Sequence, residues 1–589
     1  MHVRSWSGAI RTLGACVSTA CLALPLAGAA LAGPTATVLS DPKARTVYSE
    51  PVTFSARVTG ATPSGTVTFR DGDTPLATRT VSRLRSQDSL ATGDGHTCAV
   101  TVAGGVQCWG LNSLGQLGDG TTDDRRAAGA VTGLASGVVA VAAGDGHACA
   151  LTATGAVKCW GDNSWGQLGD GSMTYRTAPV PVAGLSSGVV AISAGAIHTC
   201  ALTATGGVKC WGYNGAGTLG DGTWATRTTP AQVVGLTSGI AAIAAGGAHT
   251  CALTADDGVL CWGHNNAGQV GDGTRVTRYT PTQVVGLSTG VTAISTGEAH
   301  ACALSKAGIM KCWGHNSAGQ LGRGAGSGSS GEETPAPVVG LSAVPVEIAA
   351  FRYNSCAIAA SGAAQCWGIN GSGQLGNGTT NANFAVPVPQ TVIAAGLIQI
   401  EGGYESTCAL TAAAGLLCWG NNDYGQFGDG TIDESLTPVP VTGFGSGTVM
   451  IASGASFTTS TLDAGNYPIS ARYSGDGGNA PSTSATVVHV VSKAKTKTSV
   501  NAKPRKPRVG DLVRFPIQVK AVPSATAKPV GTAIVKDGRK KLGTVTVKKG
   551  RAGLRTRGLK AGKRKITVLY KGDKNWVGSR ASRKLVVRK

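Results

Sequence analysis

The chain has 589 residues, of which 88 are glycine, 5% are aromatic and 14% are charged. So much glycine argues against a helical protein, and a hydrophobic fraction of 42% with this low charge argues against a disordered one. The formal net charge of +21 is unevenly distributed, because residues 493–589 hold 30 Lys and Arg against 3 Asp and Glu. The composition therefore favours short strands joined by glycine turns, with a strongly basic C-terminal part.

The N-terminal segment has the pattern of an export signal. Two arginines precede an almost uncharged stretch over 12–31, which ends in small residues where a signal peptidase would cleave. The stretch is also about long enough to cross a bilayer, so an uncleaved anchor is the alternative. Pro25 and the small-residue exit favour cleavage after Ala32. We therefore expect a bacterial protein that is secreted or held at the cell surface, with no membrane span after cleavage.

Fourteen of the 16 cysteines form seven pairs, and the two members of every pair are ten residues apart. The first cysteines recur every 51–54 residues, which indicates a repeat architecture. Alternating apolar residues predict a hairpin in which the two cysteines face each other about 4.5–5.5 Å apart, a separation that a disulfide accepts. Free thiols are an alternative, and a metal site is a weaker one because the spacing is not that of zinc ligands. We predict seven disulfides: Cys98–Cys108, Cys149–Cys159, Cys200–Cys210, Cys251–Cys261, Cys302–Cys312, Cys356–Cys366 and Cys408–Cys418.

Each predicted hairpin has a three-residue loop whose third residue should adopt the left-handed backbone conformation, which glycine takes at least cost. Asp257 and Ala414 replace glycine at this position in two of the seven repeats. The other five repeats have Gly104, Gly155, Gly206, Gly308 and Gly362.

A histidine precedes the first cysteine by two residues in five repeats, whereas Asn354 and Ser406 take its place in the last two. A catalytic base or metal ligand would not be replaced so freely within one chain. We therefore expect buried or hydrogen-bonded structural roles for His96, His147, His198, His249 and His300.

Every repeat continues with a Trp-Gly pair and, seven residues after the tryptophan, a glutamine that only Thr218 replaces. The tryptophans are Trp109, Trp160, Trp211, Trp262, Trp313, Trp367 and Trp419, and the glutamines are Gln116, Gln167, Gln269, Gln320, Gln374 and Gln426. This pattern over 86–456 resembles the repeat of the regulator of chromosome condensation family. The resemblance implies a seven-bladed β-propeller whose ring is closed by strands from both ends. Segments 90–93 and 451–454 nearly copy 141–144, and we expect them to supply the closing strands.

The flanks of the repeat region are related to the C-terminal part. The motif Gly-Thr-Val-x-Phe-x-Asp-Gly over 65–72 has a counterpart over 531–538, and both parts share a Tyr-x-Gly-Asp motif. Both resemble bacterial immunoglobulin-like repeats. We therefore predict an all-β protein with a seven-bladed β-propeller and two immunoglobulin-like β-sandwiches. The predicted parts are a signal peptide (1–32), the first sandwich in two halves (34–82 and 458–491), the propeller between them (86–456) and a basic second sandwich (492–589).

Sequence motifs of catalysis are absent: there is no nucleophile elbow, no phosphate-binding loop after a strand and no metal-ligand cluster outside the repeats. Asp-Gly pairs recur after the glutamines and could suggest calcium. Arg323 and Asn377 replace the aspartate in two repeats, so we interpret these pairs as turns. We expect no enzyme activity, no cofactor and no metal.

The segments after each Gly-x-Gly differ between repeats and should all emerge on one side of the ring. Tyr, Trp and Arg, which are enriched at binding interfaces, occur in them. We predict a face that binds a protein or glycan partner, the alternative being solvated loops. The candidate residues are Arg125, Arg126, Tyr175, Arg176, Trp224, Arg227, Arg275, Arg278, Tyr279 and Phe384.

The C-terminal sandwich alternates basic and apolar residues, which predicts a half-buried sheet with a cationic outer side. An exported protein meets anionic envelope polymers first, and this part has few aromatic residues for base stacking, so nucleic acid is the less favoured ligand. A merely soluble basic domain is the alternative. The candidate residues are Lys548, Lys549, Arg551, Lys563, Arg564, Lys565 and Lys571.

These features favour a non-enzymatic interaction protein outside the cell. The family resemblance implies two alternatives. One is a secreted enzyme inhibitor, since a bacterial branch with this resemblance inhibits β-lactamases. The other is guanine-nucleotide exchange as in eukaryotic members, which an export signal and hairpin disulfides disfavour. The sequence predicts no oligomeric state.

Overall fold

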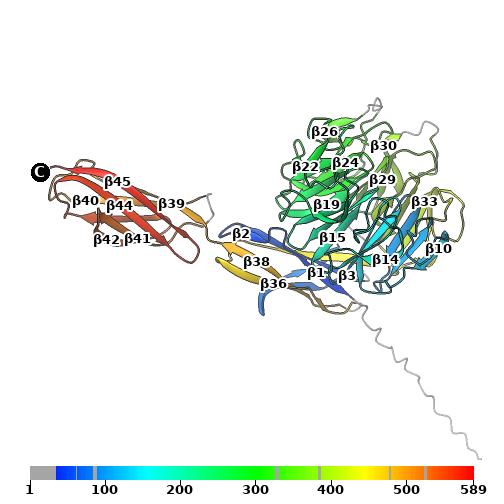
Figure 1. Ribbon diagram of the computed structural model, residues 1–589, viewed down its shortest axis with the longest axis horizontal. Helices are drawn as coiled ribbons and strands as arrows, with labels where there is room; N and C mark the ends of the chain where they lie inside the picture. The colour runs from blue at the N-terminus through cyan, green and yellow to red at the C-terminus, as the bar shows by residue number, and fades with distance from the viewer. Residues whose placement is uncertain are drawn as a thin grey trace, which may run out of the picture.

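The computed structural model describes residues 35–589 except 61–62, 84–88, 325–330, 382–385, 477–478 and 523–526. These residues form the strands β1 to β45, and they contain no helix that could cross a membrane. The predicted signal peptide and Phe384 lie outside them. The protein is all-β, and Figure 1 shows a ring of sheets beside two elongated sandwiches that follow one another away from the ring.

The ring is a seven-bladed β-propeller in which each repeat forms one antiparallel four-stranded sheet. The first strand of every blade lines a central channel of about 250 Å³. The blades are β7 (Leu90–Thr92), β8 (His96–Val100), β9 (Val106–Gly110) and β10 (Arg125–Ala130); β11 (Val138–Ala143), β12 (His147–Thr152), β13 (Val157–Gly161) and β14 (Arg176–Pro181); β15 (Val189–Ala194), β16 (His198–Thr203), β17 (Val208–Gly212) and β18 (Arg227–Gln232); β19 (Ile240–Ala245), β20 (His249–Thr254), β21 (Val259–Gly263) and β22 (Arg278–Gln283). The remaining three are β23 (Val291–Thr296), β24 (His300–Ser305), β25 (Met310–Gly314) and β26 (Glu332–Pro337); β27 (Pro345–Phe351), β28 (Asn354–Ala359), β29 (Ala364–Gly368) and β30 (Val386–Ile393); β31 (Leu397–Gly402), β32 (Ser406–Thr411), β33 (Leu416–Gly420) and β34 (Ser435–Pro440).

The second and third strands of each blade form the predicted hairpin, with opposed cysteines such as Cys149 and Cys159. All seven predicted disulfides are present, with Sγ–Sγ distances of 2.04–2.10 Å. The third loop residue keeps a positive φ even where it is not glycine, at 65° for Asp257 and 63° for Ala414. The hairpin therefore imposes this conformation, at a cost of about 1–3 kcal/mol for each non-glycine residue.

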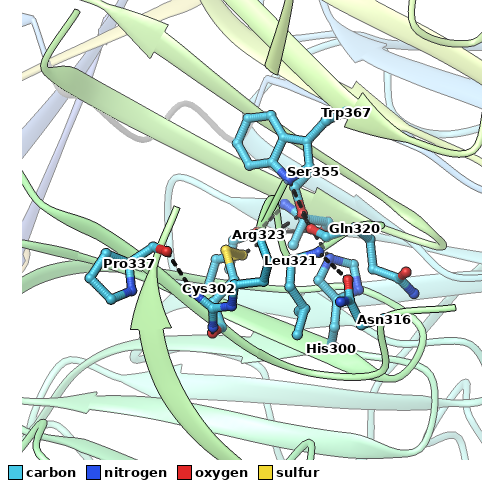
Figure 2. The surroundings of a disulfide bond; sticks show 12 residues. His300, Cys302, Asn316, Gln320, Leu321, Arg323, Pro337, Ser355 and Trp367 are labelled. Atoms are coloured by element: carbon cyan, nitrogen blue, oxygen red, sulfur yellow. Dashed lines mark hydrogen bonds between the residues drawn. A yellow bond between two sulfur atoms is a disulfide. The ribbon is translucent and has the colours of Figure 1, made fainter. Parts of the chain in front are cut away.

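The repeated tryptophans tie adjacent blades together. Each indole Nε1–H donates to a main-chain carbonyl of the preceding blade at 2.8–3.0 Å. Figure 2 shows one junction, where the Gln320 carbonyl accepts from Trp367. The same bond from Trp109 to the Gln426 carbonyl joins the seventh blade to the first. Because the acceptor is a main-chain oxygen, Thr218 serves as well as glutamine does.

The repeated histidines are buried between blades. His147 Nε2 lies 2.9 Å from the Thr199 hydroxyl of the next blade, and equivalent pairs recur. Burial lowers the pKa of all five rings, to about 3 or about 4, so they are neutral at neutral pH. The ring nitrogens of His96 and His249 have no hydrogen-bond partner, because the next blade carries alanine in place of the hydroxyl residue. These histidines are structural.

The two ends of the propeller segment meet in the first blade, where both pair with residues of its second strand or directly after it. Strand β7 pairs with one half of β8, and Val449 continues the pairing by bridging to Thr101. The predicted closing segment 451–454 does not lie in the blade. It begins β35 and enters the first sandwich, because β7 already occupies the positions opposite β8.

The segments before and after the propeller share one β-sandwich, whose core contains Phe54, Phe69 and Tyr473. Strand β35 begins at Ile451, so the second segment enters the sandwich earlier than the boundary at 458. One sheet has β1 (Ala36–Ser40), β3 (Val52–Gly60), β35 (Ile451–Thr459) and β6 (Ser82–Arg83). The other has β2 (Arg45–Val47), β38 (Val487–Ser492), β36 (Gly465–Tyr473), β4 (Thr66–Asp71), β5 (Thr74–Thr80) and β37 (Ser482–Thr483).

The C-terminal residues form the second sandwich around Phe515, Tyr570 and Trp576. Its end meets the first sandwich, where the rings of Trp576 and Tyr48 lie edge to face with centroids 5.3 Å apart. One sheet has β39 (Lys495–Val500), β40 (Val513–Val522) and β43 (Arg551–Thr556). The other has β42 (Lys540–Val547), β41 (Gly531–Asp537), β44 (Gly562–Gly572) and β45 (Val577–Val587).

Strand register locates the place where the propeller is inserted. In the second sandwich, Lys548 pairs with Arg551 across a two-residue turn, directly before the ladder of β40 and β43. The equivalent pair in the first sandwich is Ser82 and Gly454, and Gly454 also pairs with Arg57 in the ladder of β3 and β35. The whole propeller therefore replaces one tight turn.

The first sandwich contacts the ring at its hairpin turns. Asp41 N–H donates to the Ala204 carbonyl at 2.9 Å, and Lys43 Nζ lies 3.0 Å from an Asp256 carboxylate oxygen. Ala204 and Asp256 lie in the turns between the second and third strands of their blades. These contacts lie on one face of the ring, which leaves the opposite face facing away from the sandwich.

Candidate binding face of the propeller

Two sets of loops form the face of the ring opposite the first sandwich, which we call the loop face. In the second blade they are 144–146, between β11 and β12, and 162–175, between β13 and β14. They are in contact, since Asp162 N–H donates to the Gly146 carbonyl at 2.8 Å. The inner loops surround the channel mouth and the outer loops surround the inner ones, so all seven blades contribute to one continuous surface.

Four of the predicted partner-binding arginines form ion pairs within their own loops. Each begins an outer strand and reaches back to the aspartate of the Asp-Gly turn, which also accepts from the following Thr or Ser. These guanidinium groups therefore hold the loops in shape, and the donors that they direct at the aspartates are not available to a partner. The pairs are Arg125–Asp119 at 2.9 Å, Arg176–Asp170 at 2.7 Å, Arg227–Asp221 at 2.8 Å and Arg278–Asp272 at 2.5 Å.

The Asp-Gly turns are held by side chains of the chain itself. In the fifth blade Arg323 takes the place of the aspartate, and Glu332 takes the place of the arginine at the start of the outer strand. The Arg323 guanidinium donates to the main-chain carbonyls of Pro337 at 2.6 Å and Cys312 at 2.5 Å, so this turn is held by the chain's own groups without an aspartate. Among the residues that the structure describes, no group of three or more His, Cys, Asp or Glu side chains could hold a metal ion.

The other predicted partner-binding residues are more accessible. Arg126 is exposed, and Arg275 forms an exposed ion pair with Glu333 at 2.8 Å. The three aromatic residues project from the outer part of the loop face: Tyr175, Trp224 and Tyr279 are 52%, 74% and 40% exposed.

A second group of apolar residues lies closer to the channel, and the sequence analysis missed it. Trp165 and Tyr213 pack edge to face with ring centroids 5.0 Å apart. The signal lies inside the repeat framework: the residue before Gly-Gln is large in three repeats and is alanine or serine in the others. We call this group the apolar crescent, because it spans the adjacent seventh, first, second and third blades: Tyr404, Tyr424, Leu114, Trp165 and Tyr213.

Charged residues surround the channel mouth beside the crescent. The Arg352 guanidinium lies 3.0 Å from Asp94, 3.7 Å from Asp145 and 4.0 Å from Glu298, and it stacks 4.0 Å over the Tyr404 ring. Arg352 has a φ of 34°, a left-handed backbone conformation. Burial and the neighbouring Asp94 raise the pKa of the Asp145 carboxyl to about 6. Each of these five residues lies four positions before the first cysteine of its own repeat. The same position in different blades therefore places different side chains around the channel mouth.

The predicted polyanion-binding residues divide between two parts of the second sandwich. Lys548, Lys549 and Arg551 lie at the turn that joins β42 to β43 in the other sheet, whereas 563–565 begin β44, which is separated from β42 by β41. Arg564 is occupied by an ion pair with the buried Asp537 carboxylate. Lys571 lies near the other end of β44. The fold therefore does not gather these residues into one site.

Family models match most of the chain. The RCC1-like domain matches residues 58–395, and regulator of chromosome condensation (RCC1) repeats match 397–426 and 415–460. The bacterial Ig-like domain (group 3) matches 500–588. The chain therefore belongs to the RCC1-like propeller family and carries a bacterial immunoglobulin-like domain after the propeller.

Individual relatives are similar to the propeller. The ultraviolet-B receptor UVR8 of Arabidopsis thaliana is 33% identical over 255 residues, which are 43% of this chain and 58% of that protein. The E3 ubiquitin-protein ligase HERC2 of Homo sapiens is 30% identical over 446 residues, 71% of this chain and 9% of that protein. The mitochondrial RCC1 domain-containing protein RUG3 of Arabidopsis thaliana is 31% identical over 56% of this chain and 81% of its own length. The chain thus spans less than two thirds of the length of the first two relatives.

Solved structures share the fold. Yeast RCC1 (Prp20), in a crystal structure with Kap60, is 21% identical, covers 62% of this chain and 90% of its own, and has a TM-score of 0.53. Human WBSCR16 is 21% identical, covers 59% of this chain and 99% of its own, and has a TM-score of 0.50. At this identity the likeness concerns the propeller fold.

Proposed function

We propose that the protein is an exported, non-enzymatic interaction protein whose loop face binds a protein partner. The observation that carries the proposal is the apolar crescent beside the charged channel mouth, on the face that points away from the first sandwich. Aromatic residues near the centre of a surface, bordered by charged groups, are typical of residues that dominate binding energy. Seven disulfides and a bacterial immunoglobulin-like domain are compatible with a place outside the cell.

The crescent is a better candidate for the centre of the interface than the outer aromatic residues. Tyr404 is held by the stacked guanidinium of Arg352, and Trp165 is held by Tyr213, so binding would cost these rings little side-chain entropy. Trp224, in contrast, is 74% exposed in an outer loop. We propose that the outer aromatic residues extend the interface and that the crescent anchors it.

Affinity capture from culture and envelope extracts, followed by binding of the captured partner to purified variants, tests the proposal. The triple variant Trp165→Ala, Tyr404→Ala and Tyr424→Ala should weaken binding by at least about 100-fold, since a single anchor residue contributes about 2–4 kcal/mol and the three effects do not simply add. The outer variant Tyr175→Ala, Trp224→Ala and Tyr279→Ala should weaken it about 10-fold.

The matched control removes exposed apolar residues from other loops of the ring, with Val234→Ala, Val285→Ala and Val344→Ala. Full binding by the crescent variant, at an unchanged melting temperature, would reject the loop face as the binding surface. Loss of binding by glycosidase treatment of the extract would show a glycan ligand in place of a protein.

We also propose that the second sandwich associates with an anionic envelope polymer. Its 30 basic residues against three acidic ones give it a strong positive potential at neutral pH. Retention of the full chain on cell envelopes should fall as salt rises from 50 to 500 mM, whereas retention that does not change with salt would contradict an electrostatic association.

A further inference from the structure

We infer that the outer side of the sheet β39–β40–β43, together with the groove at its edge, is a binding site for a phosphodiester-linked polyol polymer. The inference rests on the proposed association of the second sandwich with an anionic polymer, and it specifies the surface and the ligand chemistry. We call this surface the basic face. Its outward-facing cations are Lys495, Lys497, Arg514, Lys520, Arg551 and Arg555.

The cations of the basic face lie directly opposite one another. Lys497 pairs with Lys520, and Arg514 pairs with Arg555, in the two antiparallel ladders of the sheet. Like charges in directly opposed positions destabilise a sheet. No acidic residue occurs among the outward-facing residues of these three described strands. The charge is therefore uncompensated within the face, and an external polyanion would compensate it.

The first sandwich shows that the fold does not need these charges. By strand register, Thr53 and Thr458 occupy the positions of Arg514 and Arg555, and their hydroxyl groups are 2.7 Å apart. In the same way Ala36 and Thr59 occupy the positions of Lys497 and Lys520. Small and hydroxyl residues thus serve the same ladder.

A groove at the edge of the face gathers further cations. A cavity of about 280 Å³ is lined by four basic residues and no acidic one, among the residues described around it: Lys520, Lys528, Lys549 and Arg551. Lys549 has a φ of 49° and is followed by Gly550 with a φ of 74°. A two-residue hairpin turn with two positive φ angles favours Asn-Gly or Asp-Gly, so lysine is an unfavourable choice for the turn alone. A cleft lined by charge of one sign also focuses its field on a ligand.

The geometry points to a phosphodiester polymer with a polyol backbone. Lysine ammonium groups bind phosphate as point charges, and arginine binds it through paired donors. Alternate residues along a strand recur about every 6.6–6.8 Å, so the rows suit a ligand whose charges also repeat. Phe515, Tyr570 and Trp576, the aromatic residues of this sandwich, are all buried, so the face offers no ring on which nucleic acid bases could stack.

The test measures binding of poly(glycerol phosphate) to the full disulfide-bonded chain between 50 and 300 mM NaCl. The basic-face variant carries the first sandwich's residues: Lys497→Ala, Arg514→Thr, Lys520→Thr and Arg555→Thr. We expect affinity at 100 mM NaCl to fall roughly 100-fold and the slope of log K against log salt to decrease by about 3, as expected for four lost phosphate contacts on a flexible strand.

A matched control removes four cations from the other sheet, where Lys536 opposes Lys541 and Lys565 opposes Lys584. Changing these four to threonine lowers the net charge equally, and we expect a loss of less than about three-fold. Equal losses in the two variants would overturn the inference, because net charge alone would then explain binding. Binding of duplex DNA with equal or higher affinity, or no binding of the polymer at 50 mM NaCl, would overturn it as well.

Protein capture through the loop face serves as the independent readout. The basic-face variant should capture the partner as the unaltered chain does, so failure of the polymer site leaves the loop-face proposal intact. Melting of the second sandwich checks that the variant is folded. Because the replacement residues already occupy the same ladder in the first sandwich, we expect no loss of fold.

Discussion

The two immunoglobulin-like sandwiches use one fold for two different tasks. In the first sandwich the propeller is inserted between Ser82 and Gly454. At the equivalent turn the second sandwich has only two residues, Lys549 and Gly550. The sheet beside this position touches the propeller in the first sandwich, where Ala36 packs against a blade. In the second sandwich the same sheet is exposed and basic. The strand pairing is thus the same in both sandwiches, whereas the outward-facing residues of this sheet differ and determine what the sheet can contact.

The largest expected difference separates the second sandwich from the part of the chain that carries the propeller, and it appears in acid. The propeller buries five histidines with pKa values of about 3 or about 4, whereas the second sandwich contains no histidine. The unfolded chain binds protons near pH 6.5 and the folded ring does not, so stability is full above that pH and falls as the pH drops toward 4. The loss is at most about 1.4 kcal/mol per pH unit for each histidine.

Calorimetry from pH 7.5 to 4.5 measures this effect. The transition that contains the propeller should move to lower temperature by many degrees, and the transition of the second sandwich should move little. A shift of the same size in both transitions would mean that the histidines do not govern acid stability.

Truncation of a core residue should give the next largest difference between the two sandwiches. Phe54 and Phe515 are equivalent, fully buried residues, and truncation to alanine should cost about 3–5 kcal/mol in either sandwich. Phe54→Ala should also lower the melting temperature of the propeller, because β35 leaves the ring directly after its closing residue Val449. Phe515→Ala should leave the propeller transition unchanged. If both variants affect the propeller equally, the sandwiches do not differ in their attachment to the ring.

The smallest expected effect concerns the opposed cations. Arg514→Thr with Arg555→Thr should stabilise the second sandwich by about 0.2–1 kcal/mol, because it removes a like-charge pair. Thr53→Arg with Thr458→Arg should destabilise the first sandwich by a similar amount. Urea denaturation at low salt measures both changes, and the difference should shrink in 0.5 M NaCl. Destabilisation by the first pair of changes would show that the arginines support the fold.

The repeat pattern predicted the parts of the fold that local sequence determines. The ten-residue cysteine spacing predicted seven hairpins, and the tryptophans marked the blade junctions. Asp257 and Ala414 departed from the glycine pattern, yet their backbones adopt the expected conformation because the hairpin imposes it. The prediction that segment 451–454 would supply a closing strand was wrong. Segments 90–93 and 451–454 have similar sequences, but only the first lies beside β8, whereas the second pairs with β3.

The candidate sites depended more on contacts between distant segments. Arg176 and its equivalents looked available in the sequence, but the turn aspartates six residues before them engage their guanidinium groups. The crescent residues lie at positions inside the regular repeat, so the motifs that the repeats share do not distinguish them from their small counterparts in other blades. Pairs such as Arg514 and Arg555 become visible only through strand register, because local periodicity shows that each faces outward but not which residue it faces.

Hydrogen exchange of the full chain with and without poly(glycerol phosphate) tests most directly the claim that the two sandwiches differ in their outer contacts. We expect protection over 513–522 and 551–556 in the second sandwich, with no change over 52–60 and 451–459 in the first. Equal protection of the two sandwiches, or protection confined to β44 and β45, would contradict the account.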